Sequence, residues 1–227
     1  DVTLLFVSTQ AVGLATFQPV LERLCDEFRI VTVEPRGSGG SAPLARPYPL
    51  GEHAADVRAV VGALGAPPRL VGVGISMGAN LLFRIAHTAP GLLRGIVTVG
   101  APIAGHRRPF FPDDWLRLQE ETRRTLEVEP LLRLHVQRVF SEPEMREMLD
   151  TIVRTRSRLP RETLLSFFLD EEENDVTALL PDIATPTLVT HGRDDRLVSW
   201  AAAELTASSL PNATLHGFEG KGHLPIL

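Results

Sequence analysis

The sequence predicts an α/β protein in which helices cover both faces of a mostly parallel sheet. Short apolar runs rich in β-branched residues alternate along the chain with stretches of helical periodicity, which is typical of parallel sheets. The chain has 227 residues, enough for one sizeable core. Its composition, 44% hydrophobic and 22% charged, is that of an ordinary globular protein. We therefore expect one α/β core to account for most of the chain.

The strands are expected where apolar β-branched runs are bounded by glycine, proline or polar residues. In chain order they are Val2–Val7, Arg29–Glu34, Leu70–Val73, Gly95–Val99, Thr187–His191 and Thr214–Phe218. The predicted helices have apolar residues at helical spacing and are Phe17–Phe28, His53–Leu64, Met77–His87 and Ala201–Ser208.

One region, from Pro102 to Pro186, breaks this alternation. It has helical periodicity rich in Leu, Arg and Glu, contains no convincing strand, and is too long for an ordinary strand connection. Helix breaks are predicted at Pro130, Pro143 and Pro160. The predicted division is a core of residues 1–102 and 186–227 and an all-helical insertion, or cap, over residues 103–185.

The insertion carries six aromatic residues. We expect most of them to hold the insertion against the sheet and a minority to face an apolar substrate pocket. They are Phe110, Phe111, Trp115, Phe140, Phe167 and Phe168.

Charge and composition exclude several kinds of partner and site. The 23 basic and 28 acidic residues leave a net charge of −5, which gives no electrostatic reason to expect a nucleic acid or an anionic membrane surface. No run of 18 apolar residues predicts a membrane span. The single cysteine, Cys25, excludes an intrachain disulfide and a multi-cysteine metal site, and its apolar-periodic surroundings predict a small core residue. With no signal peptide in the printed sequence, we expect a cytoplasmic protein.

A candidate nucleophile lies in the run Gly74-Ile75-Ser76-Met77-Gly78, a G-x-S-x-G pattern. The run follows a predicted strand and leads directly into a predicted helix. Such a sharp turn holds the serine with strained backbone angles and exposes its hydroxyl above the sheet edge. It also aims the positive end of the helix at any oxyanion that forms beside the serine. Ser76 is therefore the predicted nucleophile.

Serine needs a base to take its proton, and neutral histidine is the usual one. Of seven histidines, His53, His87, His106 and His135 are expected to be solvated or packed, and His191 and His216 to occupy core or edge positions in strands. His223 differs, because it follows the last strand in the loop Gly220-Lys221-Gly222-His223-Leu224-Pro225. A base on such a loop reaches the carboxyl edge of the sheet.

The imidazole in turn needs a carboxylate to orient it. Asp194 and Asp195 follow the preceding strand, and periodicity does not separate the two candidates.

These residues resemble the α/β-hydrolase fold family over nearly the whole chain apart from the insertion. The segment from Glu34 to Ser41 is similar to its D-x-R-G-x-G-x-S loop, with Glu34 in place of Asp, and Gly222-His223-Leu224-Pro225 is similar to its G-H-x-P ending. The segment 192–198 is similar to its G-x-x-D-x-x-V motif, and that register assigns the acid to Asp195. Ser76, Asp195 and His223 then follow the family's Ser…Asp…His order.

The resemblance also implies an oxyanion hole and an alignment of this chain with the strands of the family. By position its donors are the backbone N–H groups of Met77 and Gln10, although Ser8-Thr9 stands where the family has His-Gly. The family's helical lid enters after its sixth strand, where the insertion lies. By this comparison the printed chain begins at the family's third strand and lacks its first two strands and final helix.

The predicted function is that of a serine hydrolase that cleaves a small to medium apolar ester, lactone or thioester through an acyl-enzyme. No metal or organic cofactor is implied, and the partner is a small-molecule substrate. Two alternatives stay open. The same triad supports carbon–carbon bond hydrolysis, perhydrolysis and lyase chemistry, and the altered 8–9 loop is compatible with a ligand-binding protein of low turnover.

Overall fold

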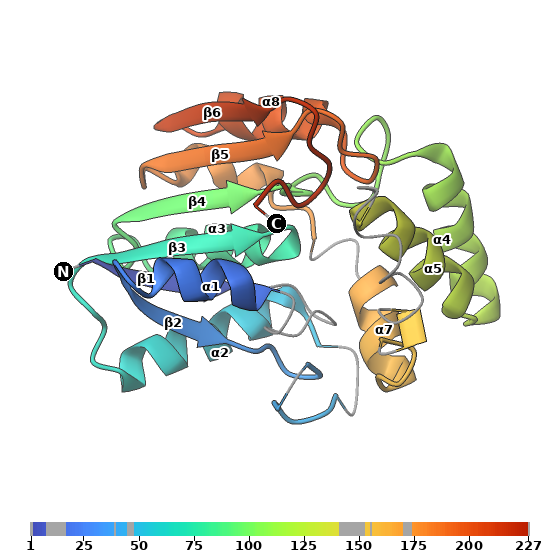
Figure 1. The fold of residues 1–227 in the computed structure, drawn as a ribbon, viewed down its shortest axis with the longest axis horizontal. Helices are drawn as coiled ribbons and strands as arrows, with labels where there is room; N and C mark the ends of the chain where they lie inside the picture. Colours follow the sequence, from blue (N-terminus) through green and yellow to red (C-terminus); the bar gives the residue numbers. More distant parts are fainter. Residues whose placement is uncertain are drawn as a thin grey trace.

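The computed structural model describes residues 2–7, 17–38, 40–44, 48–140, 153–154, 156–169 and 174–226. In these residues six strands form one parallel sheet in the order β2-β1-β3-β4-β5-β6 (Figure 1). Every predicted strand is present, with its ends shifted by at most two residues. The strands are β1 (Thr3–Val7), β2 (Arg29–Val33), β3 (Leu70–Ile75), β4 (Gly95–Val99), β5 (Thr187–Gly192) and β6 (Ala213–Phe218).

The direction in which the chain adds strands to the sheet reverses once, between β1 and β3. The chain leaves β1 for β2 on one side, whereas from β3, which pairs with the other side of β1, it continues outward to β4. Connections therefore diverge between β1 and β3. In open parallel sheets ligands bind at such a point, beyond the carboxyl ends of the strands.

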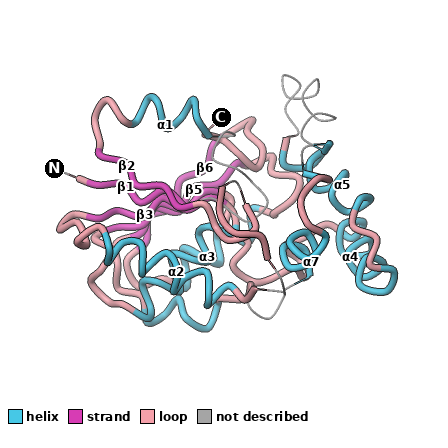
Figure 2. Tube along the Cα trace, turned by 90° about the horizontal axis from the view of Figure 1, so that it is seen from below, coloured by secondary structure: helices cyan, strands magenta, loops and turns pink. Residues whose placement is uncertain are grey.

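Helices cover both faces of the sheet, as predicted. Helix α1 (Gln18–Leu24) lies on one face, and α2 (Leu50–Ala63) and α3 (Met77–Thr88) lie on the other (Figures 1 and 2). Helix α8 (Trp200–Ser209) packs on β5 and β6. The start of α2 is earlier than predicted because Pro49, whose fixed φ suits a helix start, is its N-cap.

The prediction that Cys25 is a core residue is wrong. Helix α1 ends at Leu24, four residues before the predicted end, so Cys25 is its C-cap and leaves the periodic face. Its thiol is exposed and donates a hydrogen bond to the carbonyl oxygen of Glu22 at 3.1 Å.

Three helices occupy the stretch between β4 and β5 where the all-helical insertion was predicted. They are α4 (Asp113–Thr125), α5 (Glu129–Val139) and α7 (Arg161–Leu169), and they lie beyond the carboxyl ends of the strands (Figure 1). A 3₁₀ helix, Thr177–Asp182, then returns to the sheet. Pro130 lies in the first turn of α5 and Pro160 directly precedes α7, whereas Pro143 lies outside the described residues.

The core is continuous from the sheet into these helices. Buried side chains of β1 and β3 belong to the same apolar cluster as Trp115 of α4, Leu131 of α5 and Phe168 of α7. Within the described ranges, no helix is both long and apolar enough to cross a membrane.

Candidate active site

Ser76 sits on the predicted sharp turn between β3 and α3. Its backbone has φ 51° and ψ −125°, a left-handed conformation that is strained for a residue with a side chain. The turn is so tight that a Cβ on Gly74 would lie only 2.6 Å from Cα of Ala79. The N–H of Ser76 donates to the carbonyl oxygen of Val99 at 2.7 Å, which ties the turn to the neighbouring strand. Glycine at position 74 therefore allows the helix to start this close to the strand.

Asp195 and His223 meet after β5 and β6. Nδ1 of His223 lies 2.7 Å from Oδ2 of Asp195, and the two side chains are 1% and 0% exposed. The other carboxylate oxygen accepts the backbone N–H groups of Leu197 and Val198 at 2.8 and 3.0 Å. The carboxylate is thus held from both sides, with one oxygen on the imidazole. Asp194, the alternative candidate in the sequence, is exposed.

His191 is a third member of this cluster that the sequence did not single out. Its Nε2 lies 3.1 Å from Oδ2 of Asp195 and 2.9 Å from the carbonyl oxygen of Val198. The side chain is buried at the end of β5, which agrees with the predicted core or edge position, and it also contacts the carboxylate of Asp195. The available signal was its position four residues before Asp195 on the same sheet edge.

The charge of Asp195 is strongly stabilised. Burial by itself would raise the pKa of this carboxyl, but the adjacent charge on His223 and hydrogen bonds from His191 and His223 outweigh burial. The pKa of Asp195 is therefore held well below its usual value. The carboxylate stays ionised across the physiological range.

Ser76 and His223 line the same small cavity, of about 20 Å³, which we call the arginine cavity after Arg156. Its full lining is Phe17, Ile75, Ser76, His135, Val139, Phe140, Arg156, His223 and Leu224. Nδ1 of His223 is occupied by Asp195, and Nε2 has no hydrogen-bond partner among the described residues. This nitrogen is the one left for a proton transfer. The structure thus brings the predicted nucleophile, base and acid to one edge of the sheet.

The loop that carries His223 depends on two glycines, Gly192 at the end of β5 and Gly100 directly after the neighbouring strand β4. A Cβ on Gly192 would run into the carbonyl oxygens of Lys221 and Gly222. A Cβ on Gly100 would lie 3.1 Å from Nδ1 of His223 and 2.9 Å from its carbonyl oxygen. Close backbone approach at these positions sets where the imidazole lies.

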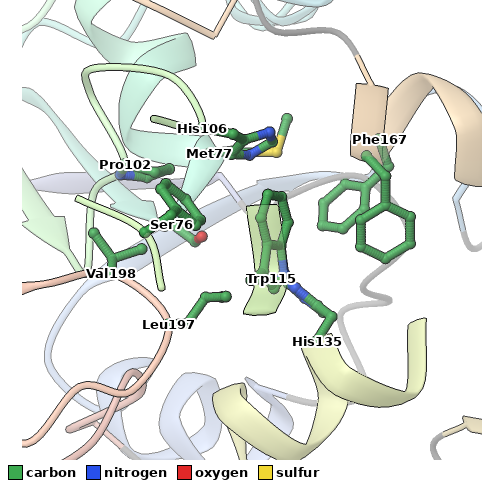
Figure 3. Close-up of a pocket in the computed structure, with 11 residues that line it drawn as sticks. Ser76, Met77, Pro102, His106, Trp115, His135, Phe167, Leu197 and Val198 are labelled. Carbon is green, nitrogen blue, oxygen red and sulfur yellow. The ribbon is translucent and has the colours of Figure 1, made fainter. Parts of the chain in front are cut away.

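Ser76 also lines a second cavity, of about 10 Å³, which we call the aromatic cavity. Figure 3 shows the hydroxyl of Ser76 on its wall, facing the side that holds Trp115 and Leu197. Its full lining is Ser76, Met77, Pro102, His106, Phe111, Trp115, His135, Phe167, Phe168, Leu197 and Val198. The free volume of each cavity is that of about one water molecule.

The insertion aromatics pack into the core as expected, but more of them than a minority also line a cavity. Four of the six line the aromatic cavity and Phe140 lines the arginine cavity, whereas Phe110 packs against the core at its edge. The reason is geometric. The insertion lies over the carboxyl ends of the strands, so side chains that hold it to the core also form the walls around Ser76.

Two histidines expected to be merely solvated or packed also line these cavities. Burial lowers the pKa of His106 to about 3, and its Nδ1 lies 2.7 Å from Nε2 of Gln119. Burial, together with the charge of Arg156, holds the pKa of His135 well below its usual value. Both rings are therefore neutral at physiological pH. His135 packs edge-on against Phe167 and Phe168 and lines both cavities.

Of the two predicted oxyanion donors, the structure describes Met77 but not Gln10. Met77 is the first residue of α3, and its N–H therefore has no acceptor within the helix. Gln10, with Ser8 and Thr9, lies outside the described residues. Among the side chains that the structure describes, no group of three or more His, Cys, Asp or Glu residues is arranged to hold a metal ion.

Comparisons with known proteins agree with this architecture. The family described as alpha/beta hydrolase fold matches residues 11–227. The chain is 29% identical over 228 residues to "Pimeloyl-[acyl-carrier protein] methyl ester esterase" of Xanthomonas oryzae, covering 93% of this chain and 83% of that protein. It is 30% identical over 224 residues to "Putative carbamate hydrolase RutD" of Caulobacter vibrioides, covering 92% and 78%.

A solved structure is similar over nearly the whole of this chain. A thermophilic esterase from Thermogutta terrifontis superimposes with a TM-score of 0.82 at 25% identity, covering 99% of this chain and 84% of that one.

Proposed function

The chain belongs to the alpha/beta hydrolase fold family, and we propose that it is a serine ester hydrolase with Ser76 as nucleophile, His223 as base and Asp195 as orienting acid. The observation that carries the proposal is the 2.7 Å contact of Asp195 with Nδ1 of His223, a histidine that lines the same cavity as Ser76. Relatives named as esterases support ester cleavage as the reaction class.

In the proposed acylation step, Oγ of Ser76 attacks the ester carbonyl carbon while Nε2 of His223 takes the hydroxyl proton. The carbonyl oxygen becomes an oxyanion, which the N–H of Met77 at the start of α3 stabilises together with the N–H of Gln10. Collapse of the tetrahedral intermediate breaks the bond to the alcohol oxygen, and His223 gives its proton to that oxygen. The acyl group stays on Ser76.

In deacylation, a water molecule gives its proton to His223 and its oxygen attacks the acyl carbon. The second intermediate collapses, the proton returns to Oγ of Ser76, and a carboxylic acid leaves. Asp195 keeps the Nδ1 proton of His223 in place and stabilises the imidazolium in each half-reaction. His191, which donates toward the same carboxylate oxygen, holds Asp195 in position.

The insertion, residues 103–185, is proposed to act as a cap over the site. Its aromatic residues supply most of the apolar wall around Ser76 and would exclude water from the acyl-enzyme. This lining favours a small to medium ester, lactone or thioester with an apolar body.

The test is hydrolysis of 4-nitrophenyl acetate, butyrate and octanoate by the wild type and the Ser76→Ala variant. We expect turnover by the wild type and a loss of at least about 10³-fold in the variant. A fluorophosphonate probe should label the wild type at Ser76 alone. Ser208→Ala, at an exposed serine of α8, is the control and should keep full activity and labelling. Equal turnover by Ser76→Ala and the wild type would reject the proposal.

A further inference from the structure

The arginine cavity contains a buried cation. Arg156, in the segment between α5 and α7, is 6% exposed and lines this cavity together with Ser76 and His223. Arginine is almost never this buried without an acidic partner, because removing its charge from water is costly. Burial lowers the pKa of Arg156 to about 10, so the guanidinium remains positively charged at neutral pH.

Nothing negative faces Arg156 within the described residues. Its guanidinium carbon lies 5.6 Å from the ring centroid of Phe140, which is a weaker partner for a cation than a carboxylate is. The cavity lining includes no Asp or Glu, and its two histidines are the neutral His135 and the base His223. Asp195 is directed at His223 and His191. Among the residues that the structure describes, the lining of the arginine cavity therefore carries a positive charge and no negative one.

Other arginines of the same region are partnered. Arg138 of α5, 22% exposed at its side chain, binds Asp114 at 2.5 Å, and the exposed Arg133 binds Glu129 at 2.9 Å. The least exposed of these three cations is thus the one without a carboxylate. A planar guanidinium recognises a carboxylate with two parallel hydrogen bonds, and such pairs are strongest where water is excluded.

We propose that the substrate carries an anionic group, a carboxylate, which binds Arg156 in the arginine cavity while the ester reaches Ser76. This inference rests on the proposed function and narrows its substrate class to esters with an apolar body and one free carboxylate. Arg156 is a specificity-determining residue, and the carboxylate belongs either to the acyl or to the alcohol portion of the ester.

Two isosteric pairs of esters test the proposal and separate these two sources. For the acyl side, monomethyl adipate is compared with methyl 6-methylheptanoate, in which two methyl groups replace the carboxylate oxygens. For the alcohol side, 4-acetoxybutanoate is compared with 4-methylpentyl acetate. We expect kcat/KM of the wild type to favour the anionic member of one pair by about 10- to 100-fold, as expected for a hydrogen bond to a charged group.

The decisive variant is Arg156→Met. It should raise KM for the anionic ester by about 10-fold or more and so remove most of the preference in kcat/KM for that ester over its neutral partner. Arg156→Lys should keep part of the preference, and Arg158→Met, at an exposed arginine two residues away, should keep all of it. A merely structural arginine would instead lower turnover of both esters alike. Because Arg156→Met removes a buried charge, the melting temperature of this variant should not be lower than that of the wild type.

The outcomes distinguish this inference from the proposed function. In one outcome Ser76→Ala is inactive, and the ratio of kcat/KM for the anionic and neutral esters of each pair is small and equal in the wild type and Arg156→Met. The proposed anion site is then wrong, and the proposed hydrolase function stands. If the wild type hydrolyses none of the four esters, binding of adipate to the Ser76→Ala protein decides. An adipate affinity that falls about 10-fold or more on adding Arg156→Met supports the site, and an unchanged affinity overturns it.

Discussion

Nδ1 of His223 and Oδ2 of Asp195 lie 2.7 Å apart although 28 residues separate them in the chain. The two residues follow β6 and β5, which are neighbours in the sheet and run parallel, so their following loops meet at the same edge. Asp195 is further fixed by the N–H groups of residues 197 and 198 and by His191. The pair is thus positioned by sheet pairing and by local turn geometry together.

The two adjacent aspartates after β5 should differ in function. Asp195→Asn keeps the shape but removes the charge that orients and stabilises the imidazolium, so kcat for a 4-nitrophenyl ester should fall by about 10⁴-fold. Asp194→Asn, at the exposed neighbour, should change kcat by less than about twofold. Steady-state kinetics on both variants checks this, and comparable losses would contradict the assignment of Asp195.

Gly192 at the end of β5 should be intolerant of any side chain. A Cβ there meets the carbonyl oxygens of residues 221 and 222, so Gly192→Ala must displace the loop that carries His223. A shift of about 1 Å in a catalytic group costs on the order of 10²-fold in rate. The matched change Gly62→Ala lies on the exposed side of α2, where nothing is within 4 Å.

Gly62→Ala should leave kcat unchanged and stabilise the protein by about 0.5–1 kcal/mol, since alanine is the better helix former. Urea unfolding and kcat of the two variants are the measurements. An active Gly192→Ala enzyme would show that the loop does not depend on this contact.

The strained conformation of Ser76 should cost stability. Its φ of 51° and ψ of −125° suit glycine better than serine, so Ser76→Gly should raise the free energy of unfolding by about 1 kcal/mol while it abolishes turnover. The same change at Ser208, inside α8, should instead lower it by about 0.5–1 kcal/mol. Urea denaturation of both variants is the check. If Ser76→Gly is the less stable protein, the strain is absent.

Acid should destabilise the fold partly through His53. Burial, although opposed by Asp56, lowers the pKa of this histidine from 6.5 to about 4. Between those values the unfolded chain binds a proton that the folded chain does not, so stability is lost as the pH falls from 6.5 to 4. The loss from this one group is on the order of 3 kcal/mol.

Urea unfolding at pH 7, 5.5 and 4.5 measures this loss. His53→Gln should flatten the pH dependence, whereas His216→Gln, on the exposed edge strand β6, is the control. Parallel pH dependences of the His53→Gln variant and the wild type would contradict the burial argument.

Local patterns in the sequence determined the sheet. Strands such as Gly95–Val99 are short apolar β-branched runs that end at glycine, and such punctuation is readable without any tertiary context. Helix ends were less certain, because they depend on caps. Pro49 began α2 earlier than periodicity suggested, and the early end of α1 moved Cys25 out of the apolar face.

The candidate nucleophile was also readable from sequence, since a G-x-S-x-G run between a strand and a helix is itself a local geometry. The carboxylate was ambiguous until the family register selected Asp195, and only the fold shows which of the two adjacent side chains turns inward to His223. The contribution of His191 was missed for the same reason. Its position four residues before Asp195 is visible in the sequence, but only the fold shows that the two side chains meet across the turn.

By itself, then, the sequence determined the architecture and the residue types available for acyl transfer, because secondary structure follows from local periodicity and from glycine and proline. The tertiary structure decided what surrounds those residues. It placed most of the insertion aromatics in the wall of the aromatic cavity and put the charge of Arg156 in the arginine cavity, whose printed lining holds no Asp or Glu; Ser76 lines both. Whether a side chain is buried or its charge is paired depends on contacts between segments far apart in the chain. Local sequence patterns do not specify those contacts, so only the tertiary structure shows them.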